Sequence, residues 1–364
     1  MSELRSILAD TVTRLLTDRV TKDVLETAEQ GQWPAALWQA LEESGLTLPL
    51  VTEKQGGAGG TWGDAHVLLA AAGRFGPPVP LAETIIASWL LSESGLEVPL
   101  GPLAVAPVHR GDVLRLERGG GGWRLSGTAQ RLPWGGSAGH LVVVTSPDGP
   151  ASGARAMVAL VAAGHAQVTP DHNLALEPRD TLVFDNTPVL TAAPAPPLIP
   201  GDIVWLCGAL ARSAQMAGGL ESLLAQTVQY AGERKQFGKP IGSFQAIQWQ
   251  CAILGEQTAA AASAAASAFS AADRSGPAEA TFEIAVAKSR TGEAAGIGAG
   301  IAHQVHGAIG FTYEHSLHFV TRRLWSWRAE FGSESRWAAT LGRAVLARGA
   351  DALWPDLTAR STSG

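Results

Sequence analysis

Apolar residues recur at helical spacing through the first part of the chain. Leucine, isoleucine, valine and tryptophan return every three or four positions, as at Leu37, Trp38 and Leu41, which is the period of an amphipathic helix. Glycine-rich breaks, the longest at 56–60, separate the helical segments. This pattern predicts an all-helical domain over residues 1–100.

The pattern changes to short β-rich runs between about residues 101 and 188. Turn chemistry, such as the glycines at 119–122, separates these runs, which predicts a small β-barrel or sandwich over residues 101–197. The tract at 194–200 is too rich in proline to continue a central strand or a helix, so we interpret it as a connector. The predicted strands are the runs at 113–116, 141–144, 157–161 and 181–184.

A helical period returns after Asp202, a candidate N-cap, and continues to Gly238-Lys239-Pro240. Three further helices are expected at 243–274, 279–305 and about 333–353. Four long helices with short connections predict an antiparallel bundle over residues 198–364, because each apolar stripe must pack against another. The expected fold class is therefore α+β.

Composition excludes several classes of protein. The 364 residues carry a net charge of -6, which provides no basic surface for nucleic acid. Two cysteines, Cys207 and Cys251, lie within helical patterns, which argues against a disulfide framework or a cysteine zinc cluster. No apolar run reaches the roughly 18 to 20 residues of a membrane span. We expect a cytoplasmic protein with no nucleic-acid or membrane partner.

Two motifs near the ends of bundle helices combine side chains suited to a flavin dinucleotide. Such a cofactor requires a bidentate cation for its diphosphate, backbone approach through glycines, and aromatic or amide groups for its rings. The candidate residues are Arg234, Gln236 and Phe237 in the first motif, and Gln304, Gly307 and Gly310 in the second. Taken alone, either motif is also compatible with a solvated charge or an ordinary helix C-cap.

Together, and in this order, the motifs strongly resemble the carboxy-terminal half of the FAD-dependent acyl-CoA dehydrogenases. The order of helical, β and helical-bundle domains resembles that family along essentially the whole chain. The resemblance implies FAD as cofactor, an acyl-CoA substrate that is desaturated between Cα and Cβ, and an electron-transferring flavoprotein as electron acceptor. In that family the equivalents of Arg234, Phe237 and the glutamine and glycines contact the FAD of a neighbouring subunit, so an oligomer is implied.

The chain departs from the family at the catalytic base. Removal of the α-proton requires a carboxylate beside the substrate. The family places a glutamate at one of two positions, which correspond to Phe331 and Gly208 here, and neither carries a carboxylate. Glu330 is one residue away and becomes the candidate catalytic base if the loop is shifted by one position. The alternative is an ordinary acidic residue near a helix N-terminus.

The β domain departs as well. Arg131 and Pro133 stand where a tryptophan and a threonine of the family flank the flavin, and Trp134 is a possible substitute. The chain thus retains what it would lend to a neighbour's FAD and has lost what would hold its own. This resemblance points to the non-catalytic partner subunit of a bacterial heteromeric acyl-CoA dehydrogenase, in a homo- or heterotetramer. A self-sufficient enzyme with Glu330 as base and an inactive scaffold subunit are the alternatives.

Two further patterns receive structural interpretations. Gly135-Gly136-Ser137-Ala138-Gly139 matches a hydrolase nucleophile elbow, but a strand follows it where a helix is required, which favours a turn. His303 and His306, with His315 and His318, lack an accompanying carboxylate or cysteine at supporting spacing, so no metal site is predicted.

Overall fold

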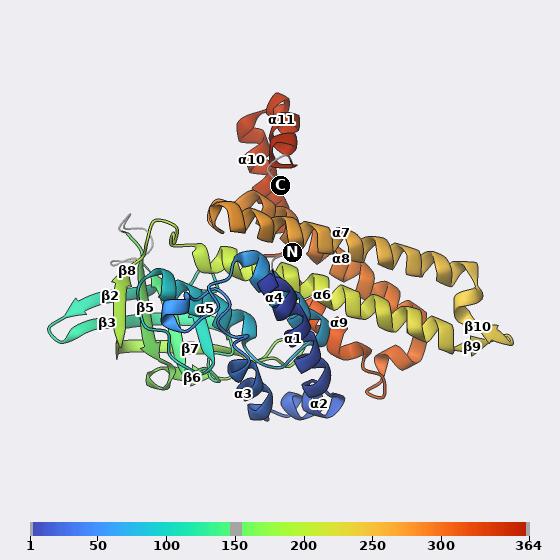
Figure 1. Ribbon diagram of the computed structural model, residues 1–364, viewed down its shortest axis with the longest axis horizontal. Coiled ribbons are helices and arrows are strands. Elements are labelled where there is room, and N and C mark those ends of the chain that lie inside the picture. Colours follow the sequence, from blue (N-terminus) through green and yellow to red (C-terminus); the bar gives the residue numbers. More distant parts are fainter. Residues whose placement is uncertain (1–2, 146–154, 362–364) are drawn as a thin grey trace.

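A computed structural model describes residues 3–145 and 155–361 (Figure 1). Its long helices are α1 (Glu3–Arg19), α2 (Lys22–Glu29), α3 (Ala35–Glu43), α4 (Trp62–Phe75), α5 (Leu81–Glu93), α6 (Ile203–Glu233), α7 (Gln245–Ser275), α8 (Thr281–His306), α9 (Leu317–Ala329), α10 (Glu334–Arg348) and α11 (Ala350–Ser361). Its strands are β1 (Leu103–Ala106), β2 (Leu114–Gly119), β3 (Gly122–Pro133), β4 (His140–Thr145), β5 (Met157–Ala162), β6 (Gln167–Thr169), β7 (Arg179–Pro188), β8 (Thr191–Pro194), β9 (Lys235–Gln236) and β10 (Lys239–Pro240). The predicted α+β class and the order of its three parts are confirmed.

The amino-terminal helices pack on both of the other parts. A capping box between Thr61 and Asp64 starts α4, which satisfies backbone N–H groups at its N-terminus. The two sides of α5 contact β1 and α6, and this helix is buried from Leu81 to Leu91. Its largely apolar sequence follows from that position, since a helix covered on all sides has no solvent face.

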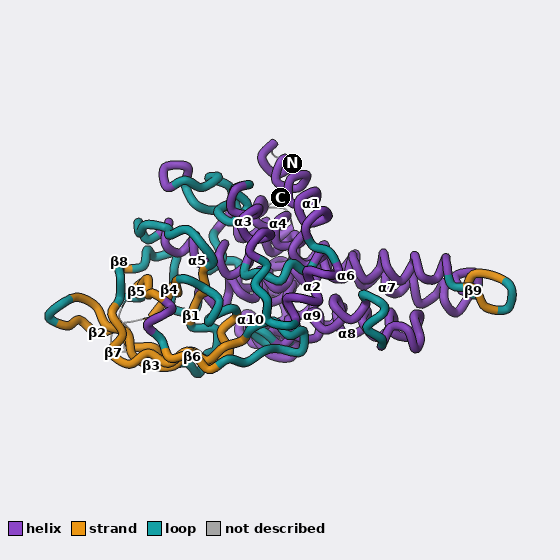
Figure 2. The backbone as a smooth tube through the Cα atoms, turned by 90° about the horizontal axis from the view of Figure 1, so that it is seen from below, coloured by secondary structure: helices purple, strands orange, loops and turns teal. Residues whose placement is uncertain are grey.

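The middle part consists of two four-stranded sheets, in the orders β1-β4-β5-β8 and β2-β3-β7-β6 (Figure 2). Strand β4 pairs in parallel with β1 and antiparallel with β5, and the interiors of β4 and β5 are buried. Continuous valine and leucine runs fit strands that are covered on both faces. Strand β3 bends at irregular pairings with β7 and leads to the edge where the main pocket opens.

The carboxy-terminal bundle is formed by α6, α7, α8 and α9. The prediction of a bundle is confirmed, but its fourth helix was assigned to the wrong segment. The helix expected from about residue 333 exists as α10, packs on α8, and then leads into α11, and this pair projects from the body in Figure 1. Asp202 occupies the N-cap of α6, but its side chain makes no capping hydrogen bond.

Helix α9 was not predicted because its sequence carries polar residues at positions that are buried in the fold. Arg323 lies in its centre with a side chain only 5% exposed, and its Nε lies 3.1 Å from a Glu177 carboxylate oxygen. The apolar period that identifies a bundle helix is interrupted where a charged side chain is buried by pairing. In the part of the chain that the structure describes, no helix combines the length and apolar character needed to cross a bilayer.

Candidate functional site

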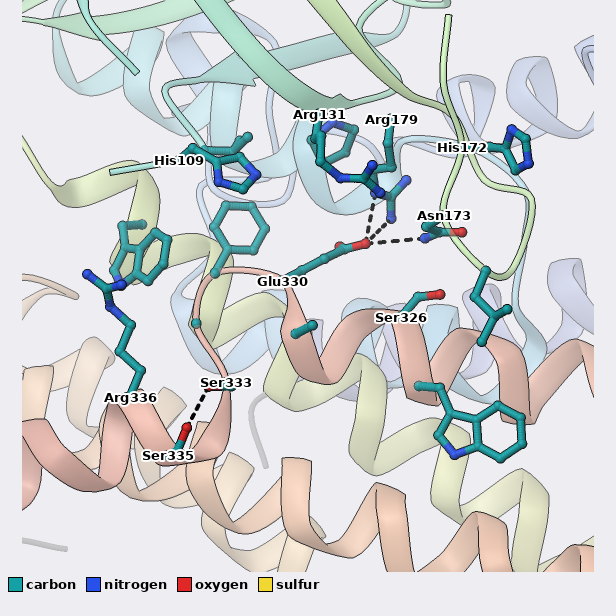
Figure 3. Close-up of a pocket in the computed structure, with 18 residues that line it drawn as sticks. His109, Arg131, His172, Asn173, Arg179, Ser326, Glu330, Ser333, Ser335 and Arg336 are labelled. Atoms are coloured by element: carbon teal, nitrogen blue, oxygen red, sulfur yellow. Dashed lines mark hydrogen bonds and ion pairs between the residues drawn. The ribbon is translucent and has the colours of Figure 1, made fainter. Parts of the chain in front are cut away.

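A large pocket lies where the β domain meets the junction of α9 and α10, and has a volume of about 690 Å³ (Figure 3). The loop before β7, the end of β3 and the start of α6 form its other walls. Its lining combines aromatic, cationic and small polar side chains, and includes His109, Arg131, His172, Asn173, Arg179, Trp205, Trp325, Glu330, Phe331, Ser333 and Arg336.

Glu330 lies in the wall of this pocket, at the C-cap of α9, and its carboxylate is fully engaged. Arg179 on β7 donates from Nε to Oε1 at 2.8 Å, and its Nη2 lies 2.7 Å from the same oxygen, which also accepts from Asn173 Nδ2 at 3.2 Å. Arg212 on α6 donates from Nε to Oε2 at 2.7 Å. Figure 3 shows the side chain turned toward Arg179 and Asn173. Both carboxylate oxygens are therefore occupied by donors from other parts of the fold.

These contacts determine the protonation of Glu330. Burial by itself raises the pKa of a carboxyl group, but the guanidinium groups of Arg179 and Arg212 outweigh it and lower the pKa of Glu330 to about 2. A general base works best with a pKa near the operating pH, whereas this carboxylate accepts a proton only in strong acid. The local chemistry is that of a structural anion.

The ion pairs of Glu330 with Arg179 and Arg212 belong to a larger buried network. Arg212 Nη2 lies 2.7 Å from Glu83 on α5, while Arg179 and Arg323 both pair with Glu177. Three carboxylates and three guanidinium groups thus alternate through the junction of the three parts of the chain, and their formal charges cancel. A buried charge is tolerated only when it is paired and hydrogen-bonded, and here each member has at least one opposite partner.

The two positions expected for a catalytic glutamate meet in space. Phe331 follows Glu330 with φ of 51°, and its ring lies directly over the backbone of Gly208 on α6. A Cβ atom added at Gly208 would stand 2.3 Å from two carbons of that ring, which is far inside van der Waals contact. An aromatic ring therefore fills the space between the two positions, and glycine at 208 is what allows it to approach.

Lys288 on α8 holds the segment between α9 and α10. Its ammonium group donates to the carbonyl oxygens of Arg328 at 2.9 Å and Gly332 at 2.8 Å, and the side chain is completely buried. Burial lowers the pKa of Lys288 to about 7. This contact ties the end of α9 to the start of α10 and holds Phe331 in place between them.

The first cofactor motif lies at a different place, the end of α6. Arg234, Gln236 and Phe237 are exposed on the small β9–β10 hairpin between α6 and α7, and the Phe237 ring is 92% exposed. Arg212 and Arg234 are 22 positions apart, which at 1.5 Å per residue is about 33 Å along α6. The structure therefore separates this motif from Glu330 within one chain.

The second motif lies at the same end of the bundle as the first. His306 at the end of α8 stacks on Tyr230 of α6 with ring centroids 4.5 Å apart, and this contact joins the two segments. Gln304 and Gly307 are exposed. Gly310 is buried instead, and a Cβ there would stand 3.0 Å from the Cβ of His306, so packing accounts for that glycine.

The donor set at this end fits part of FAD. The Arg234 guanidinium forms no ion pair within the described residues, so its planar donors are available for a diphosphate. The ring of Phe237 offers an open face, and the position of a Cβ at Gly307 has no atom within 4 Å, so a ligand can approach the backbone there. These groups face away from the protein, as expected of contacts made to a cofactor held elsewhere.

The positions flanking the pocket in the β domain do not reproduce a flavin cradle. Arg131 has φ of 48° and pairs with Asp171 at 2.7 Å, while Pro133 ends β3. Trp134 does not line the main pocket, because its indole is buried against Trp33 with centroids 6.4 Å apart. Trp134 therefore lies outside the pocket that holds Glu330.

Sequence reasoning missed the partners of Glu330. Asn173, Arg179 and Arg212 lie 157, 151 and 118 positions from it, and no motif connects them. Of these three residues, only Arg212 could have been recognised from the sequence, because an arginine in the otherwise largely apolar first half of α6 requires an anionic partner.

The remaining motifs have structural positions. Ser137 lies in the turn between β3 and β4, with no strand-to-helix elbow around it. His303 and His306 stack on aromatic rings, and no group of three potential ligands is arranged for a metal ion within residues 3–145 and 155–361. Burial raises the pKa of both thiols, Cys207 and Cys251, which disfavours thiolate chemistry at neutral pH.

Comparison with solved structures supports the fold. A variant of the Tcur3481-Tcur3483 steroid ACAD superimposes with a TM-score of 0.83 at 26% identity, covering 95% of this chain and 98% of that one. One chain of the ChsE4-ChsE5 complex from Mycobacterium tuberculosis gives 0.80 at 23% identity, covering 94% and 97%. The FAD complex of PigA has the same fold, with a TM-score of 0.83 at 19% identity over 96% of this chain and 99% of that one.

Sequence comparison gives the same result. Acyl-CoA dehydrogenase IpdE2 of Mycobacterium tuberculosis is 30% identical over 327 residues, which are 88% of this chain and 91% of the relative. Residues 2–97 match the acyl-CoA dehydrogenase N-terminal domain, and residues 207–346 match the acyl-CoA dehydrogenase C-terminal domain. The protein is accordingly a member of the acyl-CoA dehydrogenase family.

Proposed function

We propose that this chain is the non-catalytic partner subunit of a heteromeric, FAD-dependent acyl-CoA dehydrogenase. FAD is the cofactor of the family, and the chain resembles subunits of its two-component enzymes. Its role is to complete the FAD site of a catalytic subunit through Arg234, Gln236, Phe237, Gln304 and Gly307. The catalytic subunit provides the carboxylate base.

One observation carries the proposal: the pocket of this chain offers no free carboxylate base at either of the two positions expected for it. Glu330 is held by Arg179 and Arg212 with a pKa of about 2, and the Phe331 ring covers Gly208. Each candidate position for a catalytic carboxylate is thus either neutralised by pairing or filled by a phenyl ring. Removal of an α-proton at neutral pH requires a positioned base that can accept it, and neither expected carboxylate position supplies one.

The exposed hairpin explains how such a chain still contributes to a flavoenzyme. FAD, when bound, supplies the hydride acceptor for desaturation of the acyl-CoA. Arg234 contributes charge-assisted hydrogen bonds to the diphosphate, and Phe237 shields one side of it from water. Because Arg234 lies about 33 Å along α6 from Arg212, the partner of Glu330, this end serves a cofactor bound by another subunit. An electron-transferring flavoprotein would be the electron acceptor of the complex.

Visible absorption and native mass test the proposal directly. The chain purified alone should be colourless, and co-purification with its catalytic partner should yield a yellow complex that an acyl-CoA bleaches. Arg234→Ala should reduce FAD content of the complex by more than tenfold, since it removes a bidentate phosphate contact. A lone chain that holds FAD and is bleached by acyl-CoA would refute the partner role and establish a self-sufficient enzyme.

Glu330→Gln distinguishes a partner subunit from a self-sufficient enzyme. In a partner subunit, the complex retains its turnover as long as the variant chain folds and assembles. In a self-sufficient enzyme, loss of the base lowers kcat by several orders of magnitude while FAD stays bound. An inactive scaffold predicts a third result: Arg234→Ala leaves the FAD content of the complex unchanged.

A further inference from the structure

The pocket that contains Glu330 has more positive than negative charge in its wall. Its lining includes the arginines Arg131, Arg179 and Arg336 and two histidines, and Glu330 is the only carboxylate among the described residues that line it. Glu330 is already neutralised, because both Arg179 and Arg212 pair with it. No anion of the chain is left inside the pocket to balance a further cation.

Arg336 is the arginine of this pocket whose charge is not balanced. Arg131 pairs with Asp171 at 2.7 Å, and Arg179 pairs with two carboxylates. The side chain of Arg336, in the first turn of α10, forms no ion pair or hydrogen bond in the part of the chain that the structure describes. Its guanidinium carbon lies 5.2 Å from the ring centroid of Trp205, a cation–π contact that holds the side chain without neutralising it.

A second unbalanced guanidinium lies on the same indole. Arg110, in the loop after β1, has its guanidinium carbon 5.1 Å from the ring centroid of Trp205, and it too forms no ion pair with a described residue. The two guanidinium carbons are therefore within about 10 Å of each other. Trp205 and His109 line both this pocket and an adjoining one of about 350 Å³. Figure 3 shows His109 and Arg336 on the left of the pocket.

The carboxylates of the adjoining pocket do not balance these two arginines. Asp112 and Asp202 line that pocket, but neither forms an ion pair with Arg110. The Asp112 carboxylate accepts from the backbone N–H of Gln130 at 3.2 Å, and burial raises its pKa, which favours the neutral form. Asp202 is exposed to solvent. The counter-charge is thus left to solvent ions or to a ligand.

The remainder of the pocket suits the apolar body of a ligand. Leu174 and Trp325 line it, and they are the chain neighbours of Asn173 and Ser326, which lie to the right of Arg336 in Figure 3. A volume of about 690 Å³ is that of a small-molecule site. The planar donors of an arginine match an oxyanion in pairs, whereas an uncharged thioester carbonyl does not neutralise a guanidinium.

We propose that this pocket binds a small organic anion, consisting of a carboxylate or phosphate head group on an apolar body. The head group pairs with Arg336, and the charge of Arg110 adds to the attraction. The body extends toward Leu174 and Trp325. The ligand is bound without being converted, because neither position expected for a carboxylate base supplies one. This chain forms the site by itself, so the inference goes beyond the proposed contribution to a neighbour's FAD.

Isothermal titration calorimetry of the full chain tests the site with three probes that share one ring system. The probes are 2-naphthoate, 2-naphthyl phosphate and the uncharged 2-naphthamide. At least one anion should bind saturably with Kd below about 1 mM, and the amide should bind at least about tenfold more weakly. The tighter anion identifies the head group. No saturable binding of either anion, or an amide that binds equally tightly, would overturn the proposal.

Arg336→Gln tests where the head group lies. The variant should raise Kd of the tighter anion at least about tenfold, since a charge-assisted contact is lost. Arg336 is exposed and unpaired among the described residues, so the free energy of unfolding should not change. Arg343→Gln is the matched control, because Arg343 is exposed on the same helix and does not line the pocket. Unchanged affinity in Arg336→Gln, or an equal loss in Arg343→Gln, would contradict the assignment.

The result can be distinguished from a failure of the proposed function. In the complex with a catalytic subunit, Arg234→Ala should reduce FAD content and leave binding of the anion unchanged, and Arg336→Gln should do the reverse. Loss of FAD in Arg336→Gln would show that the pocket holds the cofactor and would overturn the anion site. Unchanged FAD content in Arg234→Ala bears on the cofactor role alone.

Discussion

Glu330→Gln should destabilise the chain substantially while leaving its shape almost unchanged. Glutamine preserves the size of the side chain and one acceptor oxygen, so packing is retained and only the negative charge is lost. In the native state that charge faces Arg179 and Arg212, which donate to it at 2.7 to 2.8 Å. The substitution therefore tests the ion pairs themselves.

The magnitude follows from the pKa. Pairing lowers the pKa of Glu330 from 4.5 to about 2, and each unit corresponds to about 1.4 kcal/mol, so the carboxylate contributes about 3 kcal/mol to folding at neutral pH. Removal of one member of a buried pair typically costs about 3 to 5 kcal/mol, which agrees with this value. Glu83 and Glu177 still partner the two arginines, which places the expected loss near the lower end.

The pH dependence gives a second measure. The native state binds the Glu330 proton more weakly than the unfolded state, so the stabilisation is fully present above about pH 4.5. It is lost progressively as the pH falls toward 2. The difference in free energy of unfolding between wild type and Glu330→Gln should accordingly be largest at neutral pH and shrink in acid.

Equilibrium urea unfolding at pH 7 and at several lower pH values provides the assay, with Glu293→Gln as control. Glu293 pairs with Arg290 at the surface, and its side chain is 61% exposed, so its loss should cost under about 0.5 kcal/mol. A loss below 1 kcal/mol for Glu330→Gln, or one that does not vary between pH 7 and pH 3, would refute the account of Glu330 as a structural anion.

Three further results are expected. Gly208→Ala should lower the free energy of unfolding by about 2 kcal/mol, because its new methyl group meets the Phe331 ring, and Phe331→Ala should abolish that cost in a double-mutant cycle; additive losses would contradict the contact. Phe237→Ala should leave the stability of the lone chain unchanged and weaken FAD retention in the complex, measured by flavin release on dilution; an unstable lone chain would point to a structural role. Between about pH 7 and pH 10, Lys288 in the unfolded chain binds a proton that the buried side chain does not. The free energy of unfolding of the wild type should therefore rise over this range relative to that of Lys288→Met. Equal pH dependence of the two free energies of unfolding, measured with urea, would contradict this.

The amino-acid sequence by itself determined the class of the protein. Helical and alternating apolar periods, with proline-rich and glycine-rich breaks, marked three parts of the chain, because each period reflects which face of an element is buried. The motifs at Arg234 and Gln304 identified the family and its cofactor, since each consists of neighbouring residues whose spacing is preserved in the chain. The absence of a carboxylate at Gly208 and Phe331 was likewise visible directly from the residue types at these positions.

The tertiary structure decided the role of Glu330. Its environment is created by Arg179 and Arg212, which belong to a strand and a helix more than 100 residues away, and pKa depends on distance and burial rather than on neighbours in sequence. The same reason explains helix α9, whose buried Arg323 looks like a surface residue until its partner Glu177 is placed beside it. Local patterns report the burial of apolar side chains, whereas the burial of paired charges becomes visible only when distant segments meet.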